Sequence, residues 1–533
     1  MHTLLRLAAG TAITTIAAGS AVMAATPDDT MVMAWNIDAM STLDPAQIGE
    51  VVTNEIILNT CDALVRHDMT NEANTLPALA ESWDVSDDGL QVTFHLVEDA
   101  VFPSGNPMTA EDLAWSMQRV LKLGFGNSAT LTEYGFTAET AEEQFVAADD
   151  HTLVMNLSKP YPIEIILQAV ASNRVAMALD KKLLLENEQD GDLGNGYLTT
   201  QTACVGPYHV RQWNAGEVVV LEANENYHGE KPALNRWIIR HVPEAGAQRL
   251  LLEQGDIDVA RNLGAEDLRE LESNEDVALE SNKKHQMFYM AFDNAQERFA
   301  DDRVRLAFKY MIDYDGLGET VMAYDGVPRN QVVPFGAYGA LDEEEGKPFY
   351  LDLDKAKALL EEAGYGDGFE AKMNIGSLPY NAPVAQHIQE NASKLGITLD
   401  IEQMANAQLF SSFRGRDFDT LLISWSTSVP HAHGMLARHA VNPDNSEEAK
   451  LTMYPTWRAS WYKPEFNEKI EAALFETDKD KQLQMYRELQ EDHMQHGPFA
   501  YMFQITDNAA MRNNVDNWQW HAFRTDYGSA GKN

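Results

Sequence analysis

Two pairs of residues have types and spacings that could support chemistry. His431 and His433 stand two positions apart, so both imidazoles could donate hydrogen bonds to an anionic ligand or bind a metal chelate. A solvated or helix-capping pair of histidines explains the same spacing. Cys61 and Cys204 are the only cysteines, and they could form a disulfide or remain two buried thiols. They could not bind a metal ion without further ligands.

Sequence motifs of the common hydrolases and nucleotide-binding enzymes are missing. The sequence has no G-x-S-x-G elbow, no H-E-x-x-H pair, no C-x-x-C pair and no G-x-x-x-x-G-K-[ST] phosphate loop. Pairs of acids are too common among 82 Asp and Glu residues to indicate a glycosidase. We therefore expect no enzyme activity, no cofactor and no resident metal ion.

The composition excludes two further classes of protein. The chain has 40 Lys and Arg residues against 82 Asp and Glu residues, so its formal net charge is −42. This charge excludes a protein that binds nucleic acid through the phosphates. Hydrophobic residues make up 44% of the chain and aromatic residues 9%, which is too apolar for a disordered acidic protein. A chain of 533 residues is long enough for about two to four domains.

The N-terminus has the pattern of a secretory signal peptide. His2 and Arg6 precede an apolar stretch without acids, and Val22 and Ala24 place small residues at the −3 and −1 positions, so we expect cleavage after residue 24. A short buried helix is the alternative. No cysteine lies near this position, so we expect a free periplasmic protein rather than a lipoprotein. No later stretch is apolar over enough residues to insert into a membrane. Export to an oxidising compartment favours the disulfide.

Short strands alternate with helical patterns along the chain, which indicates an α/β protein. The turn at 86–89 and the alternating strand at 92–96 predict a β-hairpin. Thr109 is the predicted N-cap of a helix, because acids fill the turn that follows it and an apolar stripe continues to Val120. The other clear predictions are helices over 301–312 and 352–363 and buried strands over 288–292 and 420–425.

Several short runs of sequence carry a resemblance to a known family. By these runs and their order, the chain resembles the bacterial extracellular solute-binding proteins of family 5, which serve ABC importers of peptides, opines and nickel. The runs are Leu76–Trp83, Val92–Leu96, Val101–Leu113, Val205–Tyr208, Asn224–Pro232, Gly255–Asp258, Asp302–Ala307 and Leu359–Tyr365.

The resemblance implies a two-lobed periplasmic-binding-protein fold of the type II or cluster C kind. Two α/β lobes would close on a ligand, and the chain would cross between them near 284–286 and near 505–508. Lobe I would then comprise residues 25–284 and 508–533, with a large insertion forming a subdomain, and lobe II residues 285–507. A disulfide between the two cysteines would lie within lobe I and leave lobe closure free.

The resemblance also places the ligand between the lobes, beside the segment that follows strand 420–425. Trp425 could stack there on a ligand or a cation, or it could be a core residue at the strand end. Ser428 stands where peptide binders of the family commonly carry an Asp for the N-terminal ammonium. Leu378 stands where dipeptide binders carry an Arg for the C-terminal carboxylate. A standard free dipeptide is therefore unexpected, since a buried zwitterion needs compensating charges.

Four other residues are candidates for ligand contact. Tyr380 and Asn381 are neutral polar residues suited to recognising amides, and Asn54 is a weaker candidate from lobe I. Arg458 could offer a cation to an acidic group of the ligand, although a surface ion pair explains it equally well.

We therefore expect a monomeric periplasmic solute-binding protein that captures a small, peptide-like solute and delivers it to the permease subunits of an ABC transporter. The same role with another cargo is the first alternative: an opine, a modified amino acid, or a metal chelate held through His431 or His433. A secreted hydrolase on a two-lobed scaffold is the second.

Overall fold

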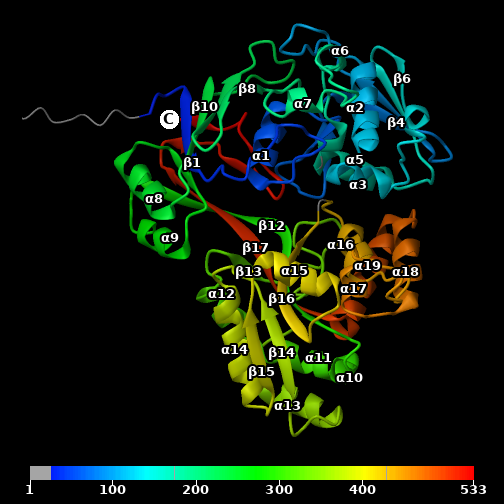
Figure 1. Cartoon of the computed structure of the whole chain (residues 1–533), viewed down its shortest axis with the longest axis vertical. Coiled ribbons are helices and arrows are strands. Elements are labelled where there is room, and N and C mark those ends of the chain that lie inside the picture. Colours follow the sequence, from blue (N-terminus) through cyan, green and yellow to red (C-terminus); the bar gives the residue numbers. More distant parts are fainter. Residues whose placement is uncertain (1–25, 173, 428) are drawn as a thin grey trace, which may run out of the picture.

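The computed structural model describes residues 26–172, 174–427 and 429–533. The predicted signal peptide and Ser428 lie outside these residues. The described chain forms two lobes, one above the other in Figure 1, joined by the long strands β12 and β17. We call the part that contains β1–β11 and β18–β21 lobe I, and the part that contains β13–β16 and α10–α19 lobe II.

One sheet of 11 strands runs through both lobes. In spatial order it consists of β15 (Thr398–Gln403), β14 (Glu370–Ile375), β16 (Thr420–Ser426), β12 (Val277–Phe292), β17 (Phe499–Arg512), β11 (Val259–Arg261), β1 (Thr30–Trp35), β10 (Arg236–His241), β9 (Val218–Ala223) and β8 (Tyr208–Asn214), and β13 (Gly326–Pro328) also pairs with β17.

The connection between the lobes is the antiparallel ladder of β12 and β17. The C-terminal half of β12, from Gln286 to Phe292, pairs with β16 of lobe II, whereas Ala509–Met511 of β17 pair with β11 of lobe I. The register of the ladder shifts between Lys283 and Met287. Both crossings that we inferred from the sequence lie within these two strands, and the limits of the lobes stay a prediction.

Lobe I adds a separate sheet, in the order β4 (Ala80–Val85), β5 (Gln91–Leu96), β7 (Thr152–Asn156) and β6 (Phe145–Asp149). The predicted hairpin is confirmed as β4 and β5, and the predicted N-cap Thr109 forms a capping box with Asp112 at the start of α2. Its helices are α1 (Val51–Thr60), α2 (Ala110–Leu123), α3 (Ala129–Thr132), α4 (Ala141–Gln144), α5 (Ile163–Ser172), α6 (Lys181–Glu186), α7 (Asn195–Leu198), α8 (Ala245–Gln254), α9 (Ala265–Leu271), η1 (Gly126–Ser128) and η2 (Arg174–Ala176).

Three small antiparallel pairs complete lobe I. They are β2 (Val65–His67) with β3 (Thr75–Pro77), β18 (Val515–Asp516) with β21 (Gly531–Lys532), and β19 (Gln519–His521) with β20 (Arg524–Asp526).

Lobe II packs most of its helices around its half of the large sheet. They are α10 (Glu297–Ala300), α11 (Asp302–Lys309), α12 (Tyr314–Glu319), α13 (Leu353–Glu362), α14 (Asn381–Ser393), α15 (Asn406–Arg414), α16 (Ala432–His439), α17 (Pro455–Arg458), α18 (Pro464–Leu474) and α19 (Lys479–His496). The helix predicted over 352–363 is confirmed as α13. The helix predicted over 301–312 is shorter: α11 ends at Lys309, and Met311 and Ile312 are buried beyond its end.

The disulfide between Cys61 and Cys204 is confirmed, with 4.9 Å between the Cα atoms. Both cysteines are buried in one hydrophobic cluster with β1, β9 and β10, so the bond lies within lobe I. The bond spans 143 positions of sequence, and it constrains no movement of one lobe against the other. None of the helices in the described residues is long and apolar enough to cross a membrane.

Candidate functional site

Trp425 lies near the end of β16, with its ring half-buried against the helices of lobe II. Because side chains alternate along a strand, Leu421, Ile423 and Trp425 share one face of the sheet. The ring of Trp425 makes an edge contact with His439 at 5.5 Å between centroids, and the guanidinium of Arg458 lies 5.3 Å from the ring centroid. The structure thus brings two predicted residues, Trp425 and Arg458, into direct contact.

Arg458 is a buried cation rather than part of a surface ion pair, since it is only 4% exposed. Its Nε and Nη2 both donate to the carbonyl of Thr452, and its guanidinium also lies 5.0 Å from the ring of Phe413. Burial lowers its pKa to about 10. Within the described residues it forms no ion pair with a carboxylate.

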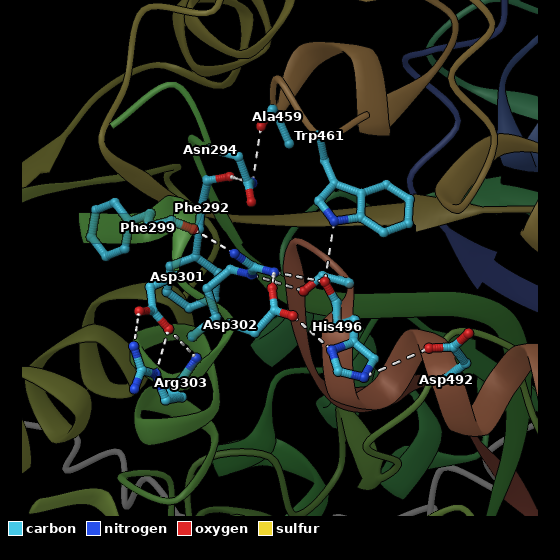
Figure 2. Close-up of polar contacts among 12 residues, drawn as sticks. Phe292, Asn294, Phe299, Asp301, Asp302, Arg303, Ala459, Trp461, Asp492 and His496 are labelled. Carbon is cyan, nitrogen blue, oxygen red and sulfur yellow. Dashed lines mark hydrogen bonds and ion pairs between the residues drawn. The ribbon is translucent and has the colours of Figure 1, made fainter. Parts of the chain in front are cut away.

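The residues that follow Arg458 are anchored to other parts of lobe II (Figure 2). The side-chain amide of Asn294 donates to the carbonyl of Ala459 at 3.0 Å, and the indole of Trp461 donates to the carbonyl of His496 at 3.1 Å. His496 in turn contacts Asp302 at 2.6 Å, and Asp302 pairs with Arg305. This network connects the residues directly after α17 to α11 and α19.

His431 and His433 play different parts. His431 is the N-cap of α16: its Nδ1 accepts a hydrogen bond from the backbone N–H of His433 at 3.0 Å, and its buried ring stacks on Tyr338. Burial lowers its pKa to about 3 and that of His433 to about 4, so both rings are neutral near pH 7. Nδ1 of His433 has no hydrogen-bond partner among the described residues.

His433 lines a cavity of about 560 Å³ between the lobes. Lobe I contributes Tyr134 and Tyr161 to the walls, and lobe II contributes Arg438, Tyr454 and Phe475 among others. Of the predicted ligand-contact residues with a described position, His433 alone lines this cavity.

Salt bridges and an aromatic contact join the lobes around this cavity. Arg438 of α16 pairs with Glu133 of lobe I at 2.8 Å, and the ring of Tyr161 lies 5.5 Å from that of Phe475. Two more exposed pairs cross the boundary nearby, Lys159–Glu471 at 3.4 Å and Lys479–Glu164 at 3.0 Å. Nothing in the sequence marks these partners, because they lie more than 300 positions apart.

Tyr380 and Asn381 lie on the opposite face of the sheet from Trp425. Tyr380 packs its ring 5.1 Å from that of Phe288, within the other hydrophobic cluster of lobe II. Burial raises its pKa to about 12. Asn381 begins α14 and is 3% exposed, and its Oδ1 lacks a hydrogen-bond partner among the described residues. The structure therefore does not bring these two residues beside Trp425.

Asn54 contacts a partly buried cation that sequence reasoning missed. Its Oδ1 accepts a hydrogen bond from Nη1 of Arg174 at 2.6 Å, and Nη2 of Arg174 donates to Asn127 at 2.8 Å. Burial lowers the pKa of Arg174 to about 10. An arginine directly after the apolar helix α5, in so acidic a chain, was the available signal.

One other part of the chain competes with the interlobe region as a candidate site. A cavity of about 780 Å³ lies within lobe I, lined by Asp62, Arg66, His228 and Arg524 among others, and it contains none of the predicted ligand-contact residues. No cluster of three or more His, Cys, Asp or Glu residues with the geometry of a metal site occurs in the described ranges.

Comparisons with known proteins agree with this two-lobed arrangement. The family model of the bacterial extracellular solute-binding proteins, family 5 (middle), matches residues 74–447. The probable D,D-dipeptide-binding periplasmic protein DdpA of Escherichia coli is 26% identical over 495 residues, which cover 92% of either chain.

Two solved structures have the same fold. HbpA2 from Haemophilus parasuis superposes with a TM-score of 0.80 at 20% identity, covering 95% of this chain and 100% of that one. A dipeptide-binding protein from a Pseudoalteromonas species, in complex with Met-Leu, gives a TM-score of 0.72 at 20% identity, covering 95% and 100%.

Proposed function

Because the chain belongs to the bacterial extracellular solute-binding proteins of family 5, we propose that it captures a small, peptide-like solute between its lobes and delivers it to the permease of an ABC importer. The observation that carries this proposal is the cavity of about 560 Å³ with walls from both lobes. A solute held there contacts both lobes only when they are together, so its binding favours the closed arrangement.

The cargo class rests on the relatives and on the walls of the site. DdpA, which matches over nearly its whole length, is described as a probable binder of D,D-dipeptides. Tyr134, Tyr161 and Phe475 offer aromatic surface to a solute, and His433 offers a neutral ring nitrogen without a partner among the described residues. A peptide-like solute has both apolar surface and hydrogen-bonding groups, as such walls require.

The proposal includes residues beyond the cavity and a location in the cell. Trp425, Arg458 and Ser428 would contact the cargo from lobe II and Asn54 from lobe I, while Tyr380, Asn381 and His431 would support the site from within lobe II. The protein would act as a free periplasmic monomer after cleavage behind residue 24, without enzyme activity or a cofactor.

Native mass spectrometry of protein purified without denaturation tests the proposal, because a tightly held cargo survives such purification. We expect a bound mass with the composition of a di- or tripeptide or a close derivative. A bound mass without amide groups, or a nickel adduct, would contradict the peptide-like cargo. Turnover of added peptides into products would contradict the role as a binding protein.

A further inference from the structure

Three hydrogen-bond donors without partners gather behind the ring of Trp425. Tyr289 and His439 are fully buried, and Oη of Tyr289 and Nε2 of His439 have no hydrogen-bond partner among the described residues. Nη1 of Arg458 likewise makes no hydrogen bond to a described residue, while the other two nitrogens of its guanidinium share the carbonyl of Thr452. A buried donor left without an acceptor costs about 1–3 kcal/mol, so the two fully buried donors, Oη of Tyr289 and Nε2 of His439, require an explanation.

The three groups are neighbours in space. The ring of Trp425 lies 5.3 Å from the guanidinium of Arg458 and 5.5 Å from the ring of His439. The ring of His439 lies 5.3 Å from that of Tyr289. Trp425 is itself only half-buried, next to the exposed residue Ser426 at the strand end. The cluster therefore lies directly beneath a side chain that reaches the surface of lobe II.

All three groups can act as donors at once. Nδ1 of His439 lies 2.8 Å from the hydroxyl of Tyr501, and when that hydroxyl donates to Nδ1, the ring proton is on Nε2. Burial, and the nearby charge of Arg458, lower the pKa of His439 well below its usual value, so the ring is neutral. The cluster thus has one positive charge and three N–H or O–H groups, and it lacks an acceptor.

The missing acceptor is notable in this sequence, which has about two acids for each base. Carboxylates are abundant, yet among the described residues none pairs with Arg458. Arg329 shows how a structural arginine of the same lobe differs: its Nε, Nη1 and Nη2 donate to the carbonyls of Val333, Asp342 and Leu341, so each nitrogen has an acceptor. Arg458 keeps one nitrogen available.

We propose that Arg458, Tyr289 and His439 form an anion-binding subsite in lobe II, which takes a carboxylate of the cargo. A carboxylate accepts up to about four hydrogen bonds through its two oxygens, which is enough for all three donors. The indole of Trp425 then covers the bound group and excludes water from it. This inference rests on the proposed function, and it narrows the cargo to solutes with an acidic group.

Matched ligands test the subsite by isothermal titration calorimetry. The probes are L-Ala-L-Ala and D-Ala-D-Ala, each as the free acid and as the C-terminal amide. We expect at least one free acid to bind about tenfold or more tightly than its amide, since a hydrogen bond to a charged group contributes about 1.5–3 kcal/mol. Equal binding of acid and amide for every dipeptide that binds would overturn the subsite and leave the proposed function standing.

Tyr289→Phe separates a binding role from a structural one. It removes a hydroxyl that has no partner in the empty protein, so we expect the melting temperature of the empty protein to stay the same or rise, while the affinity for the free acid falls about fivefold or more. Tyr486→Phe is the matched control, because Tyr486 is also fully buried and its hydroxyl is also without a partner among the described residues. An equal loss of affinity in both variants would overturn the subsite.

Crystals of the empty protein soaked in sodium bromide test the subsite without any cargo. We expect an anomalous peak within hydrogen-bond distance of Arg458, Tyr289 and His439. Water alone at this place would overturn the inference. If neither dipeptide binds in either form, the proposed function fails for these cargoes, and the bromide result alone decides whether the anion subsite exists.

Discussion

The two lobes treat buried positive charge differently. In lobe I, Arg119 pairs with Asp44 at 2.6 Å with both side chains fully buried, and Arg261 pairs with Glu55 at 2.9 Å. In lobe II, Lys309 and Arg458 are just as inaccessible, but in the described structure their hydrogen bonds go to backbone carbonyls alone.

The difference distinguishes buried cations that stabilise the fold through an ion pair from buried cations that could still pair with an anionic ligand. A paired buried cation is neutralised in place, and removing its partner destabilises the fold. A cation held only by carbonyls keeps most of its attraction for an anion. Arg305 of lobe II, which pairs with Asp302, shows that the division is not absolute.

Asp44→Asn should have the largest effect, because it leaves Arg119 buried without a counter-charge. We expect the free energy of unfolding to fall by about 3–5 kcal/mol, measured by urea denaturation. Arg458→Met in lobe II is the comparison variant, and it should cost clearly less because it leaves no carboxylate unpaired. Similar losses in the two variants would break the distinction between the lobes.

Lys309 should make the stability of the protein depend on pH. Burial lowers its pKa to about 7, so the folded protein loses this proton above that pH whereas the unfolded chain keeps it until about pH 10. The unfolded state thus binds more protons, and the free energy of unfolding should rise between about pH 7 and pH 9, by up to about 1.4 kcal/mol per pH unit.

Lys309→Met is the control for this pH dependence, since it removes the titrating group and retains an apolar side chain of similar length. Urea denaturation at several pH values should give a flatter profile for this variant. An unchanged profile would show that Lys309 stays protonated in the folded protein, paired more effectively than its single hydrogen bond to the carbonyl of Met494 indicates.

Trp425→Ala tests whether the half-buried indole belongs to the ligand site or to the core of lobe II. We expect the affinity for the cargo found by mass spectrometry to fall at least about tenfold, with the melting temperature of the empty protein nearly unchanged. Titration calorimetry and thermal denaturation measure the two quantities. A large loss of stability with unchanged affinity would show that Trp425 is a core residue.

Glu133→Gln should have the smallest effect, because it removes one partly exposed ion pair between the lobes, with Arg438. Such pairs contribute about 0.2–1 kcal/mol, so we expect a loss of affinity for the cargo of less than about fivefold, and salt should reduce it. Glu343→Gln, whose exposed pair with Lys347 lies within lobe II, is the control and should leave the affinity unchanged.

Local sequence signals predicted the fold well. The capping box of Thr109 with Asp112 spans four residues, the turn at 86–89 with the alternation after it predicted β5, and a mostly apolar run predicted β16. The site was harder to predict, because its contacts join segments that are distant in the sequence. Arg174 reaches Asn54 across 120 positions, and Tyr289 of β12 contacts His439 of α16. Spacing in the sequence also could not show that His431 caps α16 while its neighbour His433 lines the cavity.

The sheet that runs through both lobes has a mechanical consequence. A ladder of two hydrogen-bonded strands resists stretching and sliding along its length, but it bends and twists readily where pairing is interrupted, as between Lys283 and Met287 of β12. Each lobe is therefore attached to one end of a two-stranded connection that can bend at one place. In the proposed function, closure would be a rotation about that interruption with few other degrees of freedom, so little orientational entropy would be lost when the cargo brings the lobes together.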